Sequence, residues 1–273
     1  MPNYAQVLAR HLADYKSTRL GLKEDGAFVY RGKEVLHGHI IPVTQPKWLN
    51  ILEPVRADVQ KYLAGRPEVV LHQFFHHLNS SQAFALNLFF PFFEGVASPS
   101  LIRALGLNGG MKKWYPEHVG DATERTNVDI AWQDENNSWT YCEVKLSEAG
   151  FGRAKADDRH FDKLAKVYAP TLIPHCEAQL LEPKYFFANY QILRNVWLAA
   201  RDTSSSVLFL LPIQNKVLWE PLLAVKSLLK PLLAERVHVV GIENVLHTLL
   251  ADKSLDAQLA HYTELLIEKY LPV

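Results

Sequence analysis

A predicted pair of strands joined by a polar turn is the feature that most constrains how this chain can fold. Around Asp129, apolar side chains occupy every second position, which is the period of a half-buried strand. Residues 139–146 are rich in β-branched and aromatic side chains, as strands are. Residues 134–138 lie between the two segments and are polar turn-formers. The sequence therefore predicts a β-hairpin centred on Asn136.

The register of this hairpin decides which side chains meet. A hairpin centred on Asn136 places Asp129 directly opposite Glu143. Opposed side chains on one face of a sheet have Cβ atoms roughly 5 Å apart, which lets two carboxylates share one metal ion. Lys145 lies two residues beyond Glu143 and emerges on the same face, whereas Cys142 lies on the other, buried face. A slip of one residue would send Asp129 to the wrong face.

An aspartate followed at a distance by Glu-x-Lys is the smallest set of groups for metal-dependent cleavage of a phosphodiester. Mg²⁺ prefers oxygen ligands and keeps several waters, so one or two carboxylates suffice. A bound cation lowers the pKa of water, and a nearby ammonium group can orient that water or stabilise the transition state. Asp129 and Glu143 are therefore the candidate metal ligands, and Lys145 is the candidate catalytic lysine. The alternative is a surface ion pair of little consequence, because acid-x-Lys is common on exposed strands.

A family resemblance rests on several segments in a defined order. They lie at residues 76–83, 126–129, 142–148, 151–152 and 190–195. In order and spacing they resemble the PD-(D/E)xK nuclease superfamily, which has the restriction-endonuclease-like fold, and within it a bacterial subgroup. The resemblance spans about residues 70 to 215. Val128 replaces the proline that usually precedes the aspartate, a departure that the superfamily tolerates.

The resemblance implies a fold and a set of roles. Asp129 and Glu143 would ligate the metal, with the Val144 carbonyl as a further ligand, and Lys145 would be the catalytic lysine. The cofactor would be Mg²⁺, with Mn²⁺ as a substitute, and the substrate would be nucleic acid, chiefly DNA. The fold would be an α/β restriction-endonuclease-like αβββαβ core, with a mixed sheet flanked by helices.

Two further segments carry candidate binding groups. The pattern of residues 69–90 predicts a long helix, which would be the first core helix of the restriction-endonuclease-like fold. Its polar residues Asn79, Ser80 and Gln82 are candidate substrate contacts. The alternative for these residues is hydrogen bonding inside the core, because buried polar groups need partners. On a helix predicted at residues 185–200, the candidates that could support the phosphate are Gln191, as a catalytic group, and Arg194.

Charged residues near these segments have open interpretations. A guanidinium suits bidentate contact with phosphate, but a structural salt bridge is equally compatible with Arg194. Glu124 precedes Asp129 by five residues, and a solvated turn position is its favoured interpretation. Two further acids that could lie near the site are Glu94 and Asp121. A charged segment after Lys145 contains Arg153, Lys155, Arg159, Lys163 and Lys166.

The remaining pattern predicts one α/β domain, residues 1–273, with a core at about residues 68–241 and helical extensions at both ends. Other predicted helices lie at residues 4–15, 46–64, 101–105 and 255–270, and other strands at 111–118, 206–212 and 237–240. The N-terminus lacks the cationic start and apolar run of a signal peptide. The longest hydrophobic stretch is interrupted too often by polar residues to span a membrane.

Composition narrows the function classes. Lys+Arg and Asp+Glu both number 29, and the formal net charge of +0 argues against a protein that coats nucleic acid indiscriminately. Zero net charge is still compatible with a nuclease whose basic groups are confined to one cleft. His72 and His76 have the spacing of two zinc ligands on a helix, but the glutamate of a His-Glu-x-x-His motif is absent. Two cysteines form no framework or CxxC motif, so free thiols in a reducing cytoplasm are expected.

The sequence thus favours a hydrolase: a cytoplasmic, Mg²⁺-dependent, restriction-like endonuclease that hydrolyses phosphodiester bonds, chiefly in DNA. One alternative is a catalytically silent nucleic-acid-binding or interaction protein on the same fold. Another is a different enzyme in which Glu143 and Lys145 are only structural. Cutting both strands of a duplex would suit a homodimer.

Overall fold

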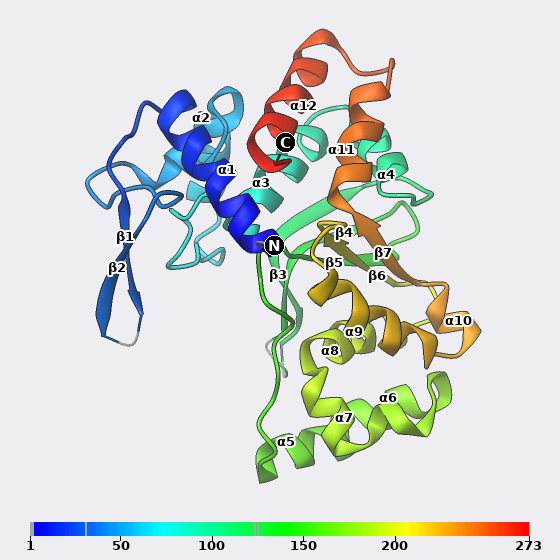
Figure 1. The fold of residues 1–273 in the computed structure, drawn as a ribbon. Coiled ribbons are helices and arrows are strands. Elements are labelled where there is room, and N and C mark those ends of the chain that lie inside the picture. The colour runs from blue at the N-terminus through cyan, green and yellow to red at the C-terminus, as the bar shows by residue number, and fades with distance from the viewer. Residues whose placement is uncertain (1–2, 31, 123, 125, 273) are drawn as a thin grey trace. The chain divides into compact units, whose positions relative to one another are not determined.

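The structure is a computed structural model of the chain, and it describes residues 3–30, 32–122, 124 and 126–272 (Figure 1). The chain forms two compact units. One contains Met1–Gly110 and Ile242–Val273, and the other contains Met111–Gly241. The expectation of one domain over the whole chain stays a prediction.

The second unit is built on a five-stranded mixed sheet. Its strand order is β3-β4-β5-β6-β7. The pairs β3–β4 and β4–β5 are antiparallel, while β5–β6 and β6–β7 are parallel. The strands are β3 (Lys113–Asp121), β4 (Thr126–Gln133), β5 (Trp139–Val144), β6 (Ser206–Leu211) and β7 (Val237–Gly241). The predicted α/β class, with a mixed sheet and flanking helices, is confirmed.

The predicted β4–β5 hairpin and its register are confirmed. Ile130 lies opposite Cys142, and the ladder continues to the pair of Gln133 and Trp139. The turn forms because one carboxylate oxygen of Asp134 accepts hydrogen bonds from the backbone amides at positions 136 and 138, both at 2.8 Å. Asx turns of this kind are the reason that such polar residues favour hairpin ends. Cys142 is fully buried, as expected.

Helices cover one face of this sheet. The helix α8 packs on β5 and β6, and its buried side chains form a core with Val207 and Phe209 of β6. The predicted helix at residues 185–200 is in fact two helices, because Asn189 has non-helical dihedral angles. The helices of this unit are α5 (Asp158–Lys163), α6 (Ala169–Leu172), α7 (Pro183–Ala188), α8 (Tyr190–Ala200), α9 (Lys216–Ser227) and α10 (Pro231–Ala234).

The first unit is mainly helical and joins segments from both ends of the chain. The last helix, α12, packs against α1, α3 and α11. The helices are α1 (Tyr4–Arg19), α2 (Glu53–Ala64), α3 (Ser81–Phe93), α4 (Ser98–Ala104), α11 (Ile242–Ala251) and α12 (Ala257–Tyr270), with a hairpin of β1 (Gly26–Tyr30) and β2 (Lys33–His37). In the part of the chain that the structure describes, no helix is long and apolar enough to cross a membrane.

The prediction of one long helix over residues 69–90 is wrong in its first half. Residues 69–80 form turns, and α3 begins only at Ser81. The Ser80 hydroxyl accepts a hydrogen bond from the Ala83 amide, so Ser80 is the N-cap. Tertiary bonds hold the preceding turns, because the Leu78 amide donates to the His39 carbonyl at 3.0 Å. Likewise, the helix predicted at residues 46–64 divides into a 3₁₀ turn and α2.

Candidate active site

Asp129 lies where β4 separates from β5. The last pair of the ladder joins Ile130 to Cys142, so Asp129 and Glu143 occupy the next position along the hairpin. Here the Asp129 carboxylate accepts a hydrogen bond of 2.7 Å from the Val144 amide. The side chain thus takes the place of a backbone acceptor at the end of the ladder. This amide bond fixes the Asp129 carboxylate beside the end of β5.

Glu143 is the centre of a buried polar cluster. Its carboxylate forms an ion pair of 2.7 Å with the Lys145 ammonium, and the two side chains are 4% and 13% exposed respectively. The same oxygen accepts a hydrogen bond of 2.7 Å from the Gln191 side chain. The other oxygen accepts one of 2.9 Å from the Asn195 side chain. Glu143, Lys145 and Gln191, predicted as catalytic residues from the sequence, are therefore in direct contact.

The orientation of the Gln191 amide is determined by the chain itself. The backbone amide of Gly152 donates to the side-chain oxygen of Gln191 at 2.8 Å. The backbone amide of Gln191 donates to the Gly152 carbonyl at 3.0 Å. The side-chain oxygen is therefore an acceptor, and its nitrogen is left to donate to Glu143. Asn195 lies four residues further along α8 and presents its amide on the same helix face. No role was predicted for Asn195 from the sequence, although its spacing of four residues from Gln191 is the signal for a shared helix face.

The charges of the cluster act on one another. Burial raises the pKa of Asp129 well above its usual value, the neighbouring Glu143 raises it further, and Lys145 opposes both. For Lys145, burial acts to lower the pKa, but Glu143, Asp129 and Glu148 together raise it above its usual value. Lys145 is therefore an ammonium group at neutral pH. It can donate hydrogen bonds and stabilise negative charge, but it cannot accept a proton.

Glu117 is an acid near the site that the sequence analysis missed. On β3, Pro116 pairs with Ile130 and His118 pairs with Val128, which places Glu117 opposite Asp129. Its charge contributes to the raised pKa of Asp129. Glu117 has a φ of 50°, a backbone conformation that is uncommon outside glycine and is concentrated at functional sites. No local pattern indicated Glu117, because its position depends on the pairing of β3 with β4.

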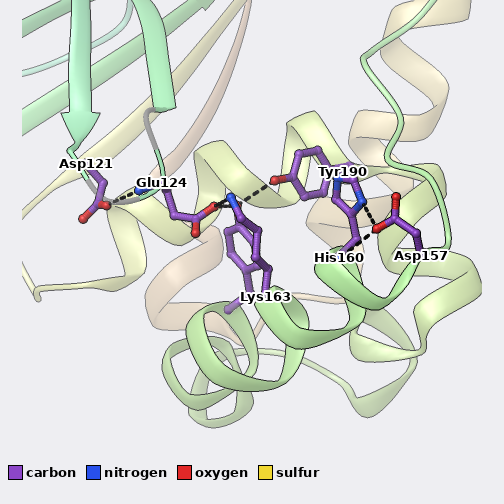
Figure 2. A network of polar contacts seen from close by, with 7 residues as sticks. Asp121, Glu124, Asp157, His160, Lys163 and Tyr190 are labelled. Carbon is purple, nitrogen blue, oxygen red and sulfur yellow. Dashed lines mark hydrogen bonds and ion pairs between the residues drawn. The ribbon is translucent and has the colours of Figure 1, made fainter.

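The other acids considered near the site have structural partners. Glu124 lies in a turn, but its side chain is not solvated, because it is 3% exposed and ion-paired with Lys163. Figure 2 shows this network. The Tyr168 hydroxyl donates to Glu124 at 2.8 Å and lies 3.0 Å from the Tyr190 hydroxyl. Because Tyr190 is the first residue of α8, the network holds the end of the helix that carries Gln191. Asp121 pairs with an arginine, Arg201, at 3.1 Å.

Arg194 extends from α8 toward the start of β4. Its guanidinium donates to the Asn127 carbonyl at 3.3 Å. Among the described residues Arg194 forms no ion pair with a carboxylate, and its buried Nε has no hydrogen-bond partner. The salt-bridge alternative raised by the sequence is thus not realised in this part of the chain. A guanidinium with free donors is suited to phosphate.

The predicted substrate contacts of the first unit have bonds within that unit. Gln82 accepts a hydrogen bond of 2.8 Å from the His72 amide, and its side chain donates to the Val70 carbonyl at 3.1 Å. Ser80 caps α3, and Asn79 directly precedes it. Their role as substrate contacts stays a prediction.

The donor set at Asp129 and Glu143 fits a hard divalent cation. Among the described residues, no three His, Cys, Asp or Glu side chains are grouped to enclose an ion, but Mg²⁺ needs only one or two carboxylates because it keeps its waters. A second observation supports the fit. Asn195 is fully buried, yet its side-chain oxygen has no hydrogen-bond partner. A hydrated cation would bring the donor that this oxygen lacks.

Comparison with known families adds an independent line of evidence. Residues 9–271 match the model of a family described as "Restriction Endonuclease associating with ARP". The chain belongs to this family. The resemblance to restriction-endonuclease-like proteins is thereby confirmed, and membership implies a nuclease that acts on DNA, in a class that typically uses divalent metals. No curated protein and no solved structure matches the chain.

Proposed function

We propose that this chain is a Mg²⁺-dependent endonuclease that hydrolyses phosphodiester bonds in DNA at the Asp129–Glu143–Lys145 cluster. The observation that carries the proposal is the contact of 2.7 Å between Glu143 and Lys145 beside Asp129, at the position where β4 separates from β5. Buried charges are costly and contribute little to stability on their own. Perturbed pKa values in such a cluster are typical of functional sites.

Each residue has a distinct role in the proposed reaction. Asp129 and Glu143 would hold the cation, and the Val144 carbonyl would be a further ligand. When bound, the cation would supply water of lowered pKa and positive charge for the phosphate oxygens. Lys145, as a permanent ammonium group, donates a hydrogen bond that orients the attacking water and stabilises the charge of the transition state.

The residues of α8 support this centre. Gln191 and Asn195 hold the Glu143 carboxylate from both of its oxygens. Arg194 binds the phosphate of the substrate through its free guanidinium donors. Arg194 makes this contact rather than Ser80 or Gln82, because the side chains of Ser80 and Gln82 form hydrogen bonds inside the first unit.

The order of elements supports the restriction-endonuclease-like core. A helix, α3, precedes three antiparallel strands, β3 to β5, and these are followed by α8 and the parallel strand β6. With α4 and the helices α5 to α7 as insertions, this order along the chain is compatible with the αβββαβ core that the family resemblance implies. We include this core in the proposal.

Cleavage of plasmid and single-stranded DNA with Mg²⁺ or Mn²⁺ tests the proposed function. We expect the wild type to cut, and Asp129→Asn and Lys145→Met each to lower the rate by about 10²- to 10³-fold, the usual effect of losing one stabilising group. Glu135→Gln is the control, because this exposed turn residue lies on the same hairpin.

Two outcomes would contradict the proposal. Equal rates in wild type and both variants would place the activity elsewhere. DNA binding by the wild type without cleavage under any metal would support the catalytically silent alternative. Thermal melting of each variant separates loss of activity from loss of the fold.

A further inference from the structure

An extended segment leaves the candidate active site directly after β5 and leads to α5 (Figure 1). Although it contains no regular secondary structure, it is anchored at successive points. Phe151 packs edge-on against Phe209 of β6, with ring centroids 5.8 Å apart. Gly152 donates a hydrogen bond to the Gln191 side chain and accepts one from the Gln191 backbone amide. The Ala154 amide donates to the Phe187 carbonyl at 3.0 Å. The segment therefore has a defined position on the second unit.

Cationic side chains are exposed on this segment and on the first turn of α5. Phe151 and Ala154 pack on the core, whereas Arg153, Lys155 and Arg159 are exposed. Among the described residues, none of these three cations forms an ion pair. We call them the arm cations.

Neighbouring charges on the same stretch behave differently. Lys163 is paired with Glu124, and Lys166 is paired with Asp162. The Asp157 carboxylate accepts a hydrogen bond from the His160 backbone amide and is also hydrogen-bonded to the His160 ring nitrogen Nδ1. The cations after residue 160 are thus paired with carboxylates. Arg153 and Lys155 form no ion pair among the described residues, and Arg159 experiences the charge of Asp157 without an ion pair.

The position of the arm cations relates them to the reaction centre. Gly152 precedes Arg153 and contacts Gln191, and Gln191 contacts Glu143. The chain as a whole has a formal net charge of +0. Affinity for a polyanion must therefore come from a local surface, because phosphate contacts by Lys and Arg supply most sequence-independent binding. Prior anchoring of the segment reduces the entropy lost on binding.

We propose that the arm cations Arg153, Lys155 and Arg159 bind the sugar-phosphate backbone of the DNA strand that enters the Glu143 site. This inference rests on the proposed function and adds the path of the substrate outside the catalytic cluster. The contacts are made to phosphates, so they set affinity and register without reading sequence.

The test measures binding of fluorescently labelled duplex DNA at several salt concentrations. The Asp129→Asn background is used without divalent metal, so that cutting of the DNA does not disturb the binding measurement. Neutralising all three arm cations to glutamine should weaken binding and lower the slope of log affinity against log salt by up to about 2.7, because each lost phosphate contact removes about 0.9.

A second triple variant with the same change of net charge is the control. It combines Lys113→Gln, Lys216→Gln and Lys230→Gln, which are exposed cations on β3, on α9 and before α10. If the arm triple and the control triple change the slope equally, or if neither changes it, the proposal is overturned. Thermal melting should be the same for both triples, because all six side chains are exposed.

Cleavage by the otherwise wild-type protein separates this proposal from the proposed function. There the arm triple should raise KM and leave kcat unchanged, as expected for contacts that are equal in the ground and transition states. A fall in kcat with unchanged KM would overturn the assignment. If the wild type neither binds nor cuts DNA, the proposed function fails first, and the arm proposal fails with it.

Discussion

At the scale of single residues, the two carboxylates of the site are held in different ways. Glu143 accepts hydrogen bonds from the side chains of Lys145, Gln191 and Asn195. Asp129 accepts a bond from the Val144 amide and experiences the like charges of its neighbours. Without a cation, the surroundings of Asp129 therefore raise its pKa, through burial first and the neighbouring Glu143 second. A divalent cation between the two carboxylates would favour the ionised form.

The pH dependence of cation binding follows from this difference. The raised pKa of Asp129 contributes stability below its usual pKa, and that stability is lost as pH rises through the raised value. Mg²⁺ requires the ionised carboxylate, so the increase in Tm caused by Mg²⁺ should grow with pH and disappear in Asp129→Asn. Thermal melting with and without Mg²⁺ across a pH series measures this. An Mg²⁺-induced shift that is independent of pH would contradict the assignment.

Glu117 provides a finer test of the same electrostatics. Glu117→Gln removes a negative charge opposite Asp129, so the pKa of Asp129 should fall. The Mg²⁺-induced increase in Tm should then begin at a lower pH than in the wild type. Glu135→Gln removes the same charge from the exposed turn and should not move this onset. An equal onset in both variants would show that Glu117 does not act on Asp129.

At the scale of elements, α8 organises the site. Gln191 and Asn195 contact Glu143, while Arg194 extends to the start of β4. The first residue of the helix, Tyr190, joins the network in Figure 2. Because Tyr168 donates its only proton to Glu124, the Tyr190 hydroxyl donates to Tyr168. This chain of bonds connects the helix to the residues that lead into β4.

Removing one hydroxyl tests the importance of this connection. Tyr168→Phe leaves the buried Glu124 carboxylate with one donor fewer, and it should lower the free energy of unfolding by about 1.5–3 kcal/mol, the usual value for a hydrogen bond to a charged group. Urea denaturation measures the change. Tyr185→Phe, on the same core but outside this network, is the matched control. A loss of stability no larger than that of the control would contradict the role of the network.

At the scale of the whole molecule, each compact unit has an ionisable group with a shifted pKa, and the two shifts have opposite consequences for stability. In the first unit, Lys269 is fully buried in α12 and donates to the backbone and side-chain oxygens of Asn50. Burial lowers the pKa of Lys269 well below its usual value, and Arg56 lowers it further. In the second unit, Asp129 is half-buried, and its pKa is raised.

The lowered pKa of Lys269 predicts a specific dependence of stability on pH. Between the lowered and the usual pKa, the unfolded chain binds a proton that the folded chain does not, so the free energy of unfolding should rise with pH across this window. Lys269→Met should remove this contribution and flatten the profile. Urea denaturation at a series of pH values measures it, with exposed Lys253→Met as the control. An unchanged slope in Lys269→Met would refute the prediction.

The β4–β5 hairpin shows how far local patterns reach. Its register was predicted because a period of two and a polar turn act within about twenty residues of chain, and the structure has the same pairs. The start of α3 was mispredicted because bonds between residues 78 and 39 hold the preceding segment in turns. Glu124 was misplaced for the same reason, since its partners Lys163 and Tyr168 lie about forty residues further along the chain.

The sequence by itself therefore determined the class of the fold, the hairpin and the candidate residues that it carries, because side-chain alternation and turn chemistry are local properties. Only the tertiary structure decided that Gln191 and Asn195 hold Glu143, and that Glu117 lies opposite Asp129. Those contacts depend on which strand pairs with which and on how α8 packs on the sheet. Long-range packing of this kind is set by the burial of the whole core and leaves no short pattern in the chain.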